Sequence, residues 1–271
     1  MIFQKPSLLL FLCFLFGTSL FSQNYVNYFT GNATDTVSKA QGGVCLMGGS
    51  RENNEAMKWF LKRANGGDIL VLRASGSDGY NDYLFSDLGI PVNSVESIVF
   101  KDSSASQEAY IQQKIRQAEG IWLAGGNQWK YVSYWRDTPI GDLINQGIQE
   151  RNIVIGGTSA GMAVLCGLYF SAQNGSIRSE QALSNPLDPK IVIDSTSFIE
   201  LDYLQDVITD THYAERNRQG RQVAFMAHAR QFYQSSVRGI ACDERTAVCI
   251  DPHGRAYVYP NNPEENGQAY F

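Results

Sequence analysis

Short apolar runs alternate along the chain with longer segments in which apolar residues recur at helical spacing. Strands are predicted for the apolar runs at 44–47, 69–72, 94–100, 120–124 and 153–155. Helices are predicted for the stretches at 53–64, 107–118 and 141–150. Buried strands that alternate with helices are typical of a mostly parallel sheet covered by helices on both faces. The pattern therefore predicts an α/β fold of three layers.

The pattern changes after residue 166. Residues 167–190 are polar and rich in Ser, Asn, Gly and Pro, which predicts a long surface loop. A second long helix is predicted at 213–232, and three strand-like runs follow it, at 237–241, 247–250 and 256–259. The turn 251–254, Asp-Pro-His-Gly, predicts a hairpin between the last two runs. Neither an internal repeat nor a linker is visible, so residues 23–271 are predicted to form a single domain.

The first 22 residues have the composition of a secretory signal. Lys5 is followed by an apolar run at 8–16 and by the small residues 17–19. A buried N-terminal helix or a membrane anchor is the alternative, but the run is short for a membrane span. We expect cleavage near Ser22 and Gln23, and a mature protein that is secreted or periplasmic.

Charge and cysteine content exclude some classes of function. The net charge is -5 and basic clusters are absent, so nothing favours nucleic acid as a partner. No second apolar run is long enough for a membrane span, and no cysteine pair has the spacing of metal ligands, so no cofactor or metal is expected. Cys242 and Cys249 could face each other across a hairpin, whereas Cys45 and Cys166 lie in apolar runs and are expected to be small core residues.

Ser159 is the candidate nucleophile. It lies in Gly157-Thr158-Ser159-Ala160-Gly161, directly after an apolar strand and before a run that can begin a helix. Small neighbours at both sides permit the sharp turn that presents a serine hydroxyl to a cleft. Such a turn also brings the Ala160 N–H to the place where an oxyanion would form.

Three histidines are candidates for the base. His253 lies in the predicted hairpin turn and His228 lies within a predicted helix. His212 lies at the start of the same helix, beside many polar residues, which suits a base that must reach a serine hydroxyl. His212 therefore ranks first, and the other two remain open.

Five segments together resemble the cyanophycinase and dipeptidase E family of serine peptidases. The segments are 73–76 (Arg-Ala-Ser-Gly), 123–128 (Leu-Ala-Gly-Gly-Asn-Gln), 155–161 around the serine, 210–221 around the histidine, and 239–247 (Gly-Ile-Ala-Cys-Asp-Glu-Arg-Thr-Ala). They occur in the family's order and span most of the chain. The resemblance implies the α/β/α sandwich of the class I glutamine-amidotransferase-like superfamily, a flavodoxin-like fold.

The same resemblance implies roles for individual residues. Ser159 would be the nucleophile, His212 the base and Glu244 the acid that orients the histidine. The backbone N–H groups of Gly126 and Ala160 would form an oxyanion hole. The acid is needed because the imidazolium that forms during attack requires an anion at its far nitrogen.

Four further positions would contact the substrate by this resemblance. They are Gln128, Asp210, Arg218 and Arg221. The two arginines could bind a substrate carboxylate in bidentate fashion, although arginines on a polar helix face are often only solvated.

Some positions leave alternatives open. Asp243 and Asp210 are substitutes for Glu244 as the acid. Thr211 stands where cyanophycinases often carry glutamine, and Asn127 where an acidic residue is common. Both differences lie at the substrate side, so they bear on β-aspartyl-arginine specificity and not on the hydrolytic residues.

The sequence as a whole predicts an exported serine peptidase. Its partner would be a peptide or isopeptide cut at an aspartyl-type residue, with a homodimer left open as its assembly. An α/β-hydrolase esterase that uses Ser159 with His253 is a second hypothesis. A non-catalytic binding protein on the same fold is a third, and the retained Ser159, His212 and Glu244 argue against it.

Overall fold

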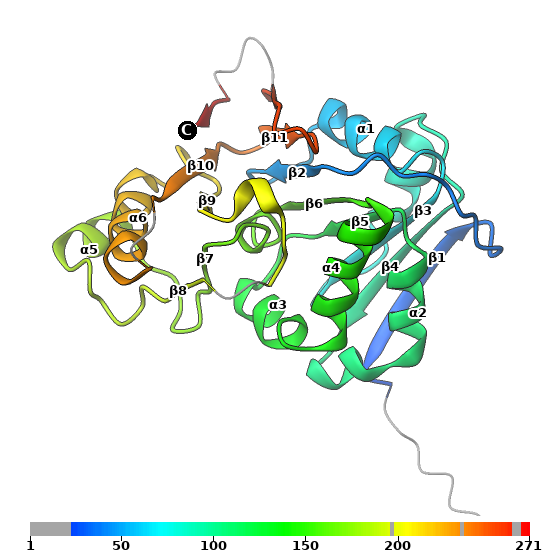
Figure 1. The fold of residues 1–271 in the computed structure, drawn as a ribbon, viewed down its shortest axis with the longest axis horizontal. Coiled ribbons are helices and arrows are strands. Elements are labelled where there is room, and N and C mark those ends of the chain that lie inside the picture. Colours follow the sequence, from blue (N-terminus) through cyan, green and yellow to red (C-terminus); the bar gives the residue numbers. More distant parts are fainter. Residues whose placement is uncertain (1–22, 196–197, 234–235, 262–266) are drawn as a thin grey trace, which may run out of the picture.

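An eight-stranded sheet forms the centre of the computed structural model, which describes residues 23–195, 198–233, 236–261 and 267–271 (Figure 1). Across the sheet, its strands are β1 (Tyr25–Gly31), β4 (Ser94–Phe100), β3 (Asp68–Arg73), β5 (Gly120–Leu123), β6 (Val154–Thr158), β2 (Val44–Met47), β11 (Ala247–Ile250) and β12 (Ala256–Tyr259). The five strands from β4 to β2 are parallel, and β1, β11 and β12 pair antiparallel at the two edges. The mostly parallel sheet that the sequence predicts is therefore confirmed.

Helices cover both faces of this sheet. One face carries α2 (Ala109–Gln117), α3 (Gln128–Trp135) and α4 (Pro139–Arg151), with the 3₁₀ turn η2 (Ser103–Gln107) beside them. The other face carries α1 (Asn54–Arg63) and the short π-helix η1 (Tyr83–Asp87). Each layer of helices buries its apolar side chains against one face of the strands, which gives the three layers expected.

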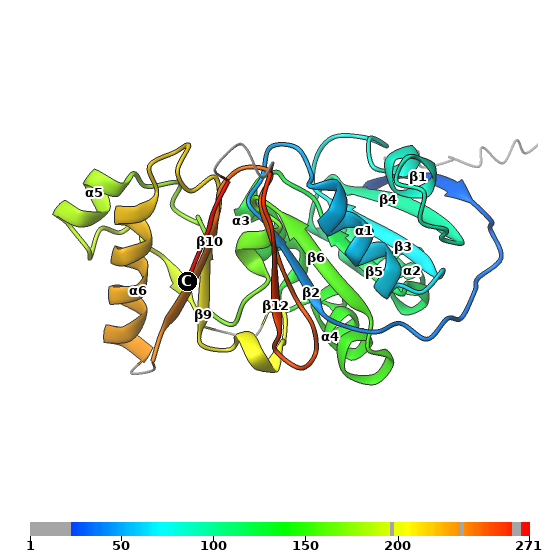
Figure 2. The same cartoon turned by 90° about the horizontal axis from the view of Figure 1, so that it is seen from above.

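A smaller unit extends the molecule at one end. Its sheet contains β9 (Val207–Asp210), β10 (Arg238–Cys242) and β13 (Ala269–Tyr270), and a separate pair joins β7 (Tyr169–Phe170) to β8 (Ile193–Asp194). Two helices, α5 (Ser179–Ser184) and α6 (Gln219–Tyr233), form a layer beyond β9 and β10 (Figure 2). An apolar cluster that includes Phe170, Ile208 and Phe225 holds this unit together. The 3₁₀ turn η3 (Met162–Val164) lies between the two units in sequence, and a second one, η4 (Asp202–Leu204), lies between β8 and β9.

Local sequence signals determine where the helices begin and end. The side chain of Asn53 accepts the backbone N–H groups of Glu55 and Ala56, and so caps the start of α1. Thr138 caps α4, with Pro139 at the first helical position, and Asn152 ends it in the left-handed conformation. These signals account for the close agreement of both helices with the sequence prediction.

The C-terminal third differs from the prediction in two ways, and its three strand-like runs are divided between two sheets. The predicted helix 213–232 begins at Gln219, because His212 and Asn217 have left-handed backbone conformations that a helix cannot contain. The predicted loop 167–190 contains β7 and α5, since Phe170, Ile177 and Ala182 are buried in the apolar cluster that includes α6. The three strand-like runs do not form one sheet: β10 belongs to the smaller sheet, whereas β11 and β12 extend the main one.

The predicted signal segment 1–22 lies outside the described residues. Within the ranges that the structure describes, no helix has both the length and the apolar content needed to cross a bilayer. The four cysteines from Cys45 onward are buried free thiols. Cys242 does not face Cys249, because the two strands lie in different sheets and their side chains join different core clusters.

Candidate active site

Ser159 occupies a sharp turn at the carboxyl end of β6. Its φ of 52° is left-handed, which is rare outside glycine. The flanking glycines are needed because a Cβ on Gly161 would lie 2.0 Å from the carbonyl oxygen of Leu123, and one on Gly157 would lie 2.6 Å from the Gly161 carbonyl carbon. The predicted helix after the turn is wrong: only the single 3₁₀ turn η3 follows. The backbone turn itself, and not a helix, therefore presents the hydroxyl.

His212 follows β9 in the smaller sheet and is also left-handed, with φ of 46°. Its backbone N–H donates to the carbonyl of Gly48 at 2.8 Å, so the end of β2 fixes its position. The imidazole packs against Gly49, where a Cβ would lie 2.4 Å from the ring Nε2. Only glycine leaves room for the ring at this position, and the φ of 117° also favours glycine.

Glu244 lies in the turn that joins β10 of the smaller sheet to β11 of the main sheet. The backbone N–H of Glu244 donates to the side chain of Glu215 at 3.0 Å. The next residue, Arg245, donates its backbone N–H to the carbonyl of Gly49 at 2.9 Å. The same Gly48-Gly49 segment therefore supports both the histidine and the turn that carries the carboxylate.

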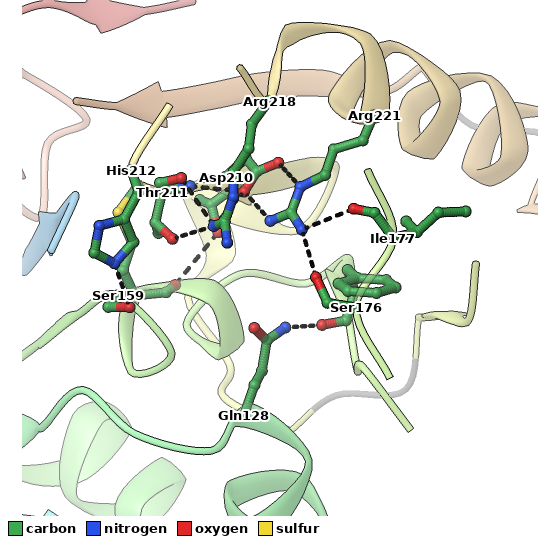
Figure 3. A network of polar contacts seen from close by, with 12 residues as sticks. Gln128, Ser159, Ser176, Ile177, Asp210, Thr211, His212, Arg218 and Arg221 are labelled. Atoms are coloured by element: carbon green, nitrogen blue, oxygen red, sulfur yellow. Dashed lines mark hydrogen bonds and ion pairs between the residues drawn. The ribbon is translucent and has the colours of Figure 1, made fainter. Parts of the chain in front are cut away.

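The three side chains form one hydrogen-bonded series. The Ser159 Oγ lies 2.8 Å from the His212 Nε2, as Figure 3 shows. The His212 Nδ1 lies 2.6 Å from the Glu244 Oε1. An Nδ1–H that donates to the carboxylate leaves Nε2 free to accept the serine proton, which is the arrangement that a general base requires.

Burial and charge keep the imidazole neutral. The pKa of His212 is lowered from its ordinary 6.5, chiefly by burial, with further lowering by the positive charges of Arg216 and Arg218. The hydrogen bond to Glu244 acts in the opposite direction. The pKa of Glu244 is itself lowered, chiefly by that hydrogen bond. A neutral histidine beside an ionised carboxylate is the state in which the pair can take a proton.

Two backbone donors lie beside the serine. Within the described residues, neither the N–H of Gly126 nor that of Ala160 donates to another group. A Cβ on Gly125 would be 3.7 Å from the Ser159 Cβ, which places the 125–126 segment against the nucleophile. Both predicted donors therefore remain available near Ser159, and their role in an oxyanion hole stays a prediction.

Ser159 and His212 line a cleft with a volume of about 1140 Å³. Three exposed arginines, Arg51, Arg216 and Arg245, line it as well. No carboxylate in the described part of the chain forms an ion pair with these three. The cleft therefore presents positive charge beside the nucleophile.

The predicted substrate-binding arginines have other partners. Arg221 donates its Nε to Asp210 Oδ2 at 2.7 Å, and its Nη2 to Asp210 Oδ1. Arg218 lies 3.3 Å from the same carboxylate and 2.9 Å from the carbonyl of Thr211, and burial lowers its pKa to about 10. Figure 3 shows both guanidinium groups converging on Asp210. Neither arginine lines the cleft that contains Ser159. The bidentate contact that we predicted for a substrate carboxylate is made by Arg221 to Asp210 instead.

Gln128, the fourth predicted contact, begins α3 and donates to the carbonyl of Phe170 (Figure 3). It thus links the main unit to β7 and does not line the serine cleft. Asn127 caps α3 by accepting the backbone N–H of Lys130. The side chain of Thr211 accepts from Arg218 at 3.0 Å. Gln128 therefore joins the two units, whereas Asn127 stabilises the start of α3 and Thr211 binds Arg218 within the smaller unit.

The other candidates for base and acid lie elsewhere. His228 packs against Phe232 within α6. His253 is exposed in the turn between β11 and β12, where its backbone N–H donates to Asp251. The carboxylate of Asp243 accepts backbone N–H groups of Ala214 and Gln268, both at 2.9 Å. Of the described residues, only His212 makes a hydrogen bond to the Ser159 hydroxyl.

Sequence reasoning missed several residues of the cleft. Glu52 lies in it and accepts the Tyr80 hydroxyl, and burial raises the pKa of its carboxyl. The guanidinium of Arg73 lies 5.7 Å over the Tyr80 ring. Arg51 and Arg245 come from turns that lie far apart in sequence. Arg73 and Arg245 lie within the segments 73–76 and 239–247 that carry the family resemblance, and Arg51 lies just after β2, where ligands commonly bind at the carboxyl ends of parallel strands.

The described residues of the site do not form a set of metal ligands. Among the residues with described positions, no three His, Cys, Asp or Glu side chains are close enough to hold an ion.

Comparison with known proteins identifies related sequences. The model of peptidase family S51 matches residues 45–256. A cyanophycinase of Trichormus variabilis (strain ATCC 29413 / PCC 7937) is 24% identical over 222 residues, a match that covers 78% of this chain and 68% of the relative. A cyanophycinase of Synechococcus elongatus is 26% identical over 230 residues, covering 80% of this chain and 65% of the relative. The chain thus spans about two thirds of the length of these relatives.

The fold also has a solved counterpart. A peptidase from an acI-B1 Actinobacterium, known from its crystal structure, superposes with a TM-score of 0.56 at 13% identity. The match covers 86% of this chain and 95% of that one. At this identity the likeness concerns the fold alone.

Proposed function

This chain belongs to peptidase family S51, and we propose that it is a serine peptidase that cleaves peptide or isopeptide bonds at aspartyl-type residues. The proposal rests above all on the hydrogen-bonded series Ser159–His212–Glu244, with distances of 2.8 and 2.6 Å, at an arginine-lined cleft.

Acylation follows from this geometry. His212 Nε2 takes the proton of the Ser159 hydroxyl as the oxygen attacks the substrate carbonyl, and Glu244 stabilises the imidazolium. The N–H groups of Gly126 and Ala160 stabilise the oxyanion, a contribution of about 10²–10³ in rate per donor in other hydrolases. The imidazolium then gives its proton to the leaving amine, which leaves an ester on Ser159.

Deacylation uses the same residues in reverse. Water gives a proton to the neutral His212 as its oxygen attacks the ester carbonyl, and the proton returns to Ser159 when the acid product leaves. The lowered pKa of His212 favours both steps, because each begins with a neutral imidazole.

The charge of the cleft supports an acidic substrate. Arg51, Arg216 and Arg245 can bind carboxylates of an aspartyl-rich peptide. The two carboxylates that also line the cleft are already engaged, since Glu55 pairs with Lys58 at 2.8 Å and Glu52 accepts from Tyr80. The relatives' name adds β-aspartyl-arginine polymer to the substrates to be tested.

Export forms part of the proposal. The charged start, the apolar run and the small residues of segment 1–22 support a secreted or periplasmic enzyme. Fractionation of cells that produce the full chain, with N-terminal sequencing of the protein found outside the cytoplasm, tests this point. Full-length protein retained in the cytoplasm would refute it.

The proposed activity is tested by incubating the purified protein with β-aspartyl-arginine polymer, aspartyl dipeptides and the matched asparaginyl dipeptides, with released amines as the readout. We expect cleavage of at least one aspartyl substrate, little cleavage of its asparaginyl match, and none by S159A. The S159A variant should keep its Tm, so that the loss reports chemistry.

Other outcomes separate the alternatives. Cleavage of simple esters without any peptide would favour an esterase, although His212, and not His253, would still be the base. Substrate binding without cleavage, together with resistance of Ser159 to a serine-directed probe, would favour a non-catalytic binding protein.

A further inference from the structure

Two of the buried cysteines lie directly opposite each other in the main sheet. Cys45 of β2 and Cys249 of β11 are partners in the antiparallel register, and both are 0% exposed. The pair next to Met47–Ala247 in this ladder is Gly48–Thr246, in which the Gly48 N–H donates to the carbonyl of Thr246 at 2.9 Å. Gly48–Thr246 is therefore a hydrogen-bonded pair, and Met47–Ala247 is a non-hydrogen-bonded pair.

Pair types alternate along an antiparallel ladder, so Cys45 and Cys249, two positions away, are also a non-hydrogen-bonded pair. The Cα atoms of such pairs are about 4.5 Å apart, and their side chains approach more closely than in the other pair type. A disulfide requires Cα atoms about 4.4–6.8 Å apart. The backbone therefore already meets the main geometric requirement for a bond.

The two side chains also point to the same side of the sheet. Both belong to the apolar cluster beneath α1, which they share with Met47 and Ala247. The two thiols lie close enough to interact, and Cys45 contributes to the raised pKa of Cys249. Cys242 and Cys166 belong to the cluster on the opposite face, and Cys242 contacts the carbonyl of Leu46 at 3.8 Å. Cys45 is therefore the partner that the fold offers to Cys249.

We propose that Cys45 and Cys249 form a cross-strand disulfide when the chain folds in the presence of a disulfide oxidant. One thiolate attacks the oxidant and forms a mixed disulfide. The second then displaces the oxidant's remaining sulfur, so that two protein thiols become one disulfide and one oxidant disulfide becomes two thiols.

The bond forms before the sheet closes. Burial raises the pKa of the Cys249 thiol well above its usual value, so the folded protein holds very little thiolate there. Enclosure in the core also excludes the oxidant. Oxidation therefore belongs to the folding step, and the closed core then protects the bond from reductants.

The position of the bond connects it with the active site. Cys45 lies just before the Gly48-Gly49 segment, which holds His212, and Cys249 lies five residues after Glu244. The disulfide would link β2, which leads into the Gly48-Gly49 segment, to β11, which follows the turn that carries Glu244. It would not contact the reacting groups, so a reduced enzyme keeps its chemistry and loses stability.

The test is a map of the thiols. Reduced, unfolded protein is refolded in a mixture of reduced and oxidised glutathione. The refolded protein is then unfolded in denaturant that contains iodoacetamide, because the free thiols are buried in the folded state, and its peptides are analysed by mass spectrometry. We expect one cross-linked species that joins the Cys45 and Cys249 peptides, with Cys166 and Cys242 alkylated. Protein refolded without oxidised glutathione, whose four thiols stay free, should have a Tm lower by roughly 4–16 °C.

Variants and a second route make the result decisive. C45A should leave Cys249 alkylated, whereas the matched control C166A should keep the cross-link. Protein folded during export to a bacterial periplasm, an oxidising compartment, gives the same map without a refolding step. Alkylation of all four thiols by both routes, or a Cys242–Cys249 link, would overturn the proposal. Neither result depends on peptidase activity.

Discussion

The imidazole of His212 lies against the Cα atom of Gly49, so closely that a methyl group there would be 2.4 Å from the ring Nε2. G49A should therefore displace the ring from Ser159 and lower kcat by roughly 10²-fold, the cost of about 1 Å of misplacement. It should also destabilise the fold by about 1–3 kcal/mol through its left-handed backbone. Kinetics and thermal unfolding of the same preparation check both effects.

G66A is the matched control for this variant. Gly66 also has a positive φ, of 80°, but an added Cβ there meets nothing within 4 Å. The G66A variant should have a lower free energy of unfolding and an unchanged kcat per folded molecule. Equal kcat values for G49A and G66A would show that contact with Gly49 does not position His212.

Replacement of Glu244 by glutamine should lower kcat by about 10²–10⁴, because the neutral amide stabilises neither the tautomer nor the imidazolium. The Tm should hardly change, since the Glu244 side chain is 30% exposed. E55Q is the control, because Glu55 lines the same cleft but pairs with Lys58. An E244Q enzyme with wild-type kcat would mean that a different group orients His212.

The acid limb of the pH profile should reflect His212. Since a general base must be neutral and the pKa of His212 is lowered, kcat/KM should fall only below about pH 6.5, the ordinary value. Arg216 contributes to this lowering, so R216A should raise the pKa and move the acid limb to higher pH. In R51A the KM should rise and the midpoint should stay in place. A midpoint that R216A leaves unchanged would refute this account of the His212 pKa.

D210N should be one of the most destabilising single changes in the chain. The Asp210 side chain is 2% exposed and Arg221 is 6% exposed, so the variant leaves a buried guanidinium without its anion, at a cost of about 3–5 kcal/mol. D206N is the matched control, because Asp206 pairs with Arg238, whose side chain is 62% exposed. That change should cost less than about 1 kcal/mol. Similar denaturant midpoints for the two variants would contradict a structural role for Asp210.

Much of the main sheet could be predicted because each strand and helix is signalled by residues close together in the sequence. Apolar runs such as 94–100, and helix signals such as Thr138 and Asn152, lie within the elements that they define. The position of Ser159 could be predicted from the local Gly-x-Ser-x-Gly sequence, although the crowding that requires glycine at 161 comes from Leu123 on the neighbouring strand β5.

Residues whose partners are distant could not be placed in the same way. Whether Arg221 binds Asp210 or a substrate depends on the path between β9 and α6, and that path contains two left-handed residues, His212 and Asn217, that no apolar pattern signals. Arg245 enters the cleft only because β10 and β11 belong to different sheets. The β1 strand was missed because its seven residues are half-buried or exposed and lack a strong apolar run.

The two sheets contribute unequally to the hydrogen-bonded series at the active site. Ser159 follows a strand of the main sheet, whereas His212 follows β9 of the smaller one and Glu244 lies where the chain passes between them. Neither sheet alone contains a competent nucleophile and base. Hydrolytic activity therefore requires that both units have folded and docked. In a nascent or partly unfolded chain, even one with an intact main sheet, Ser159 has no base beside it. Such a chain cannot attack neighbouring polypeptides.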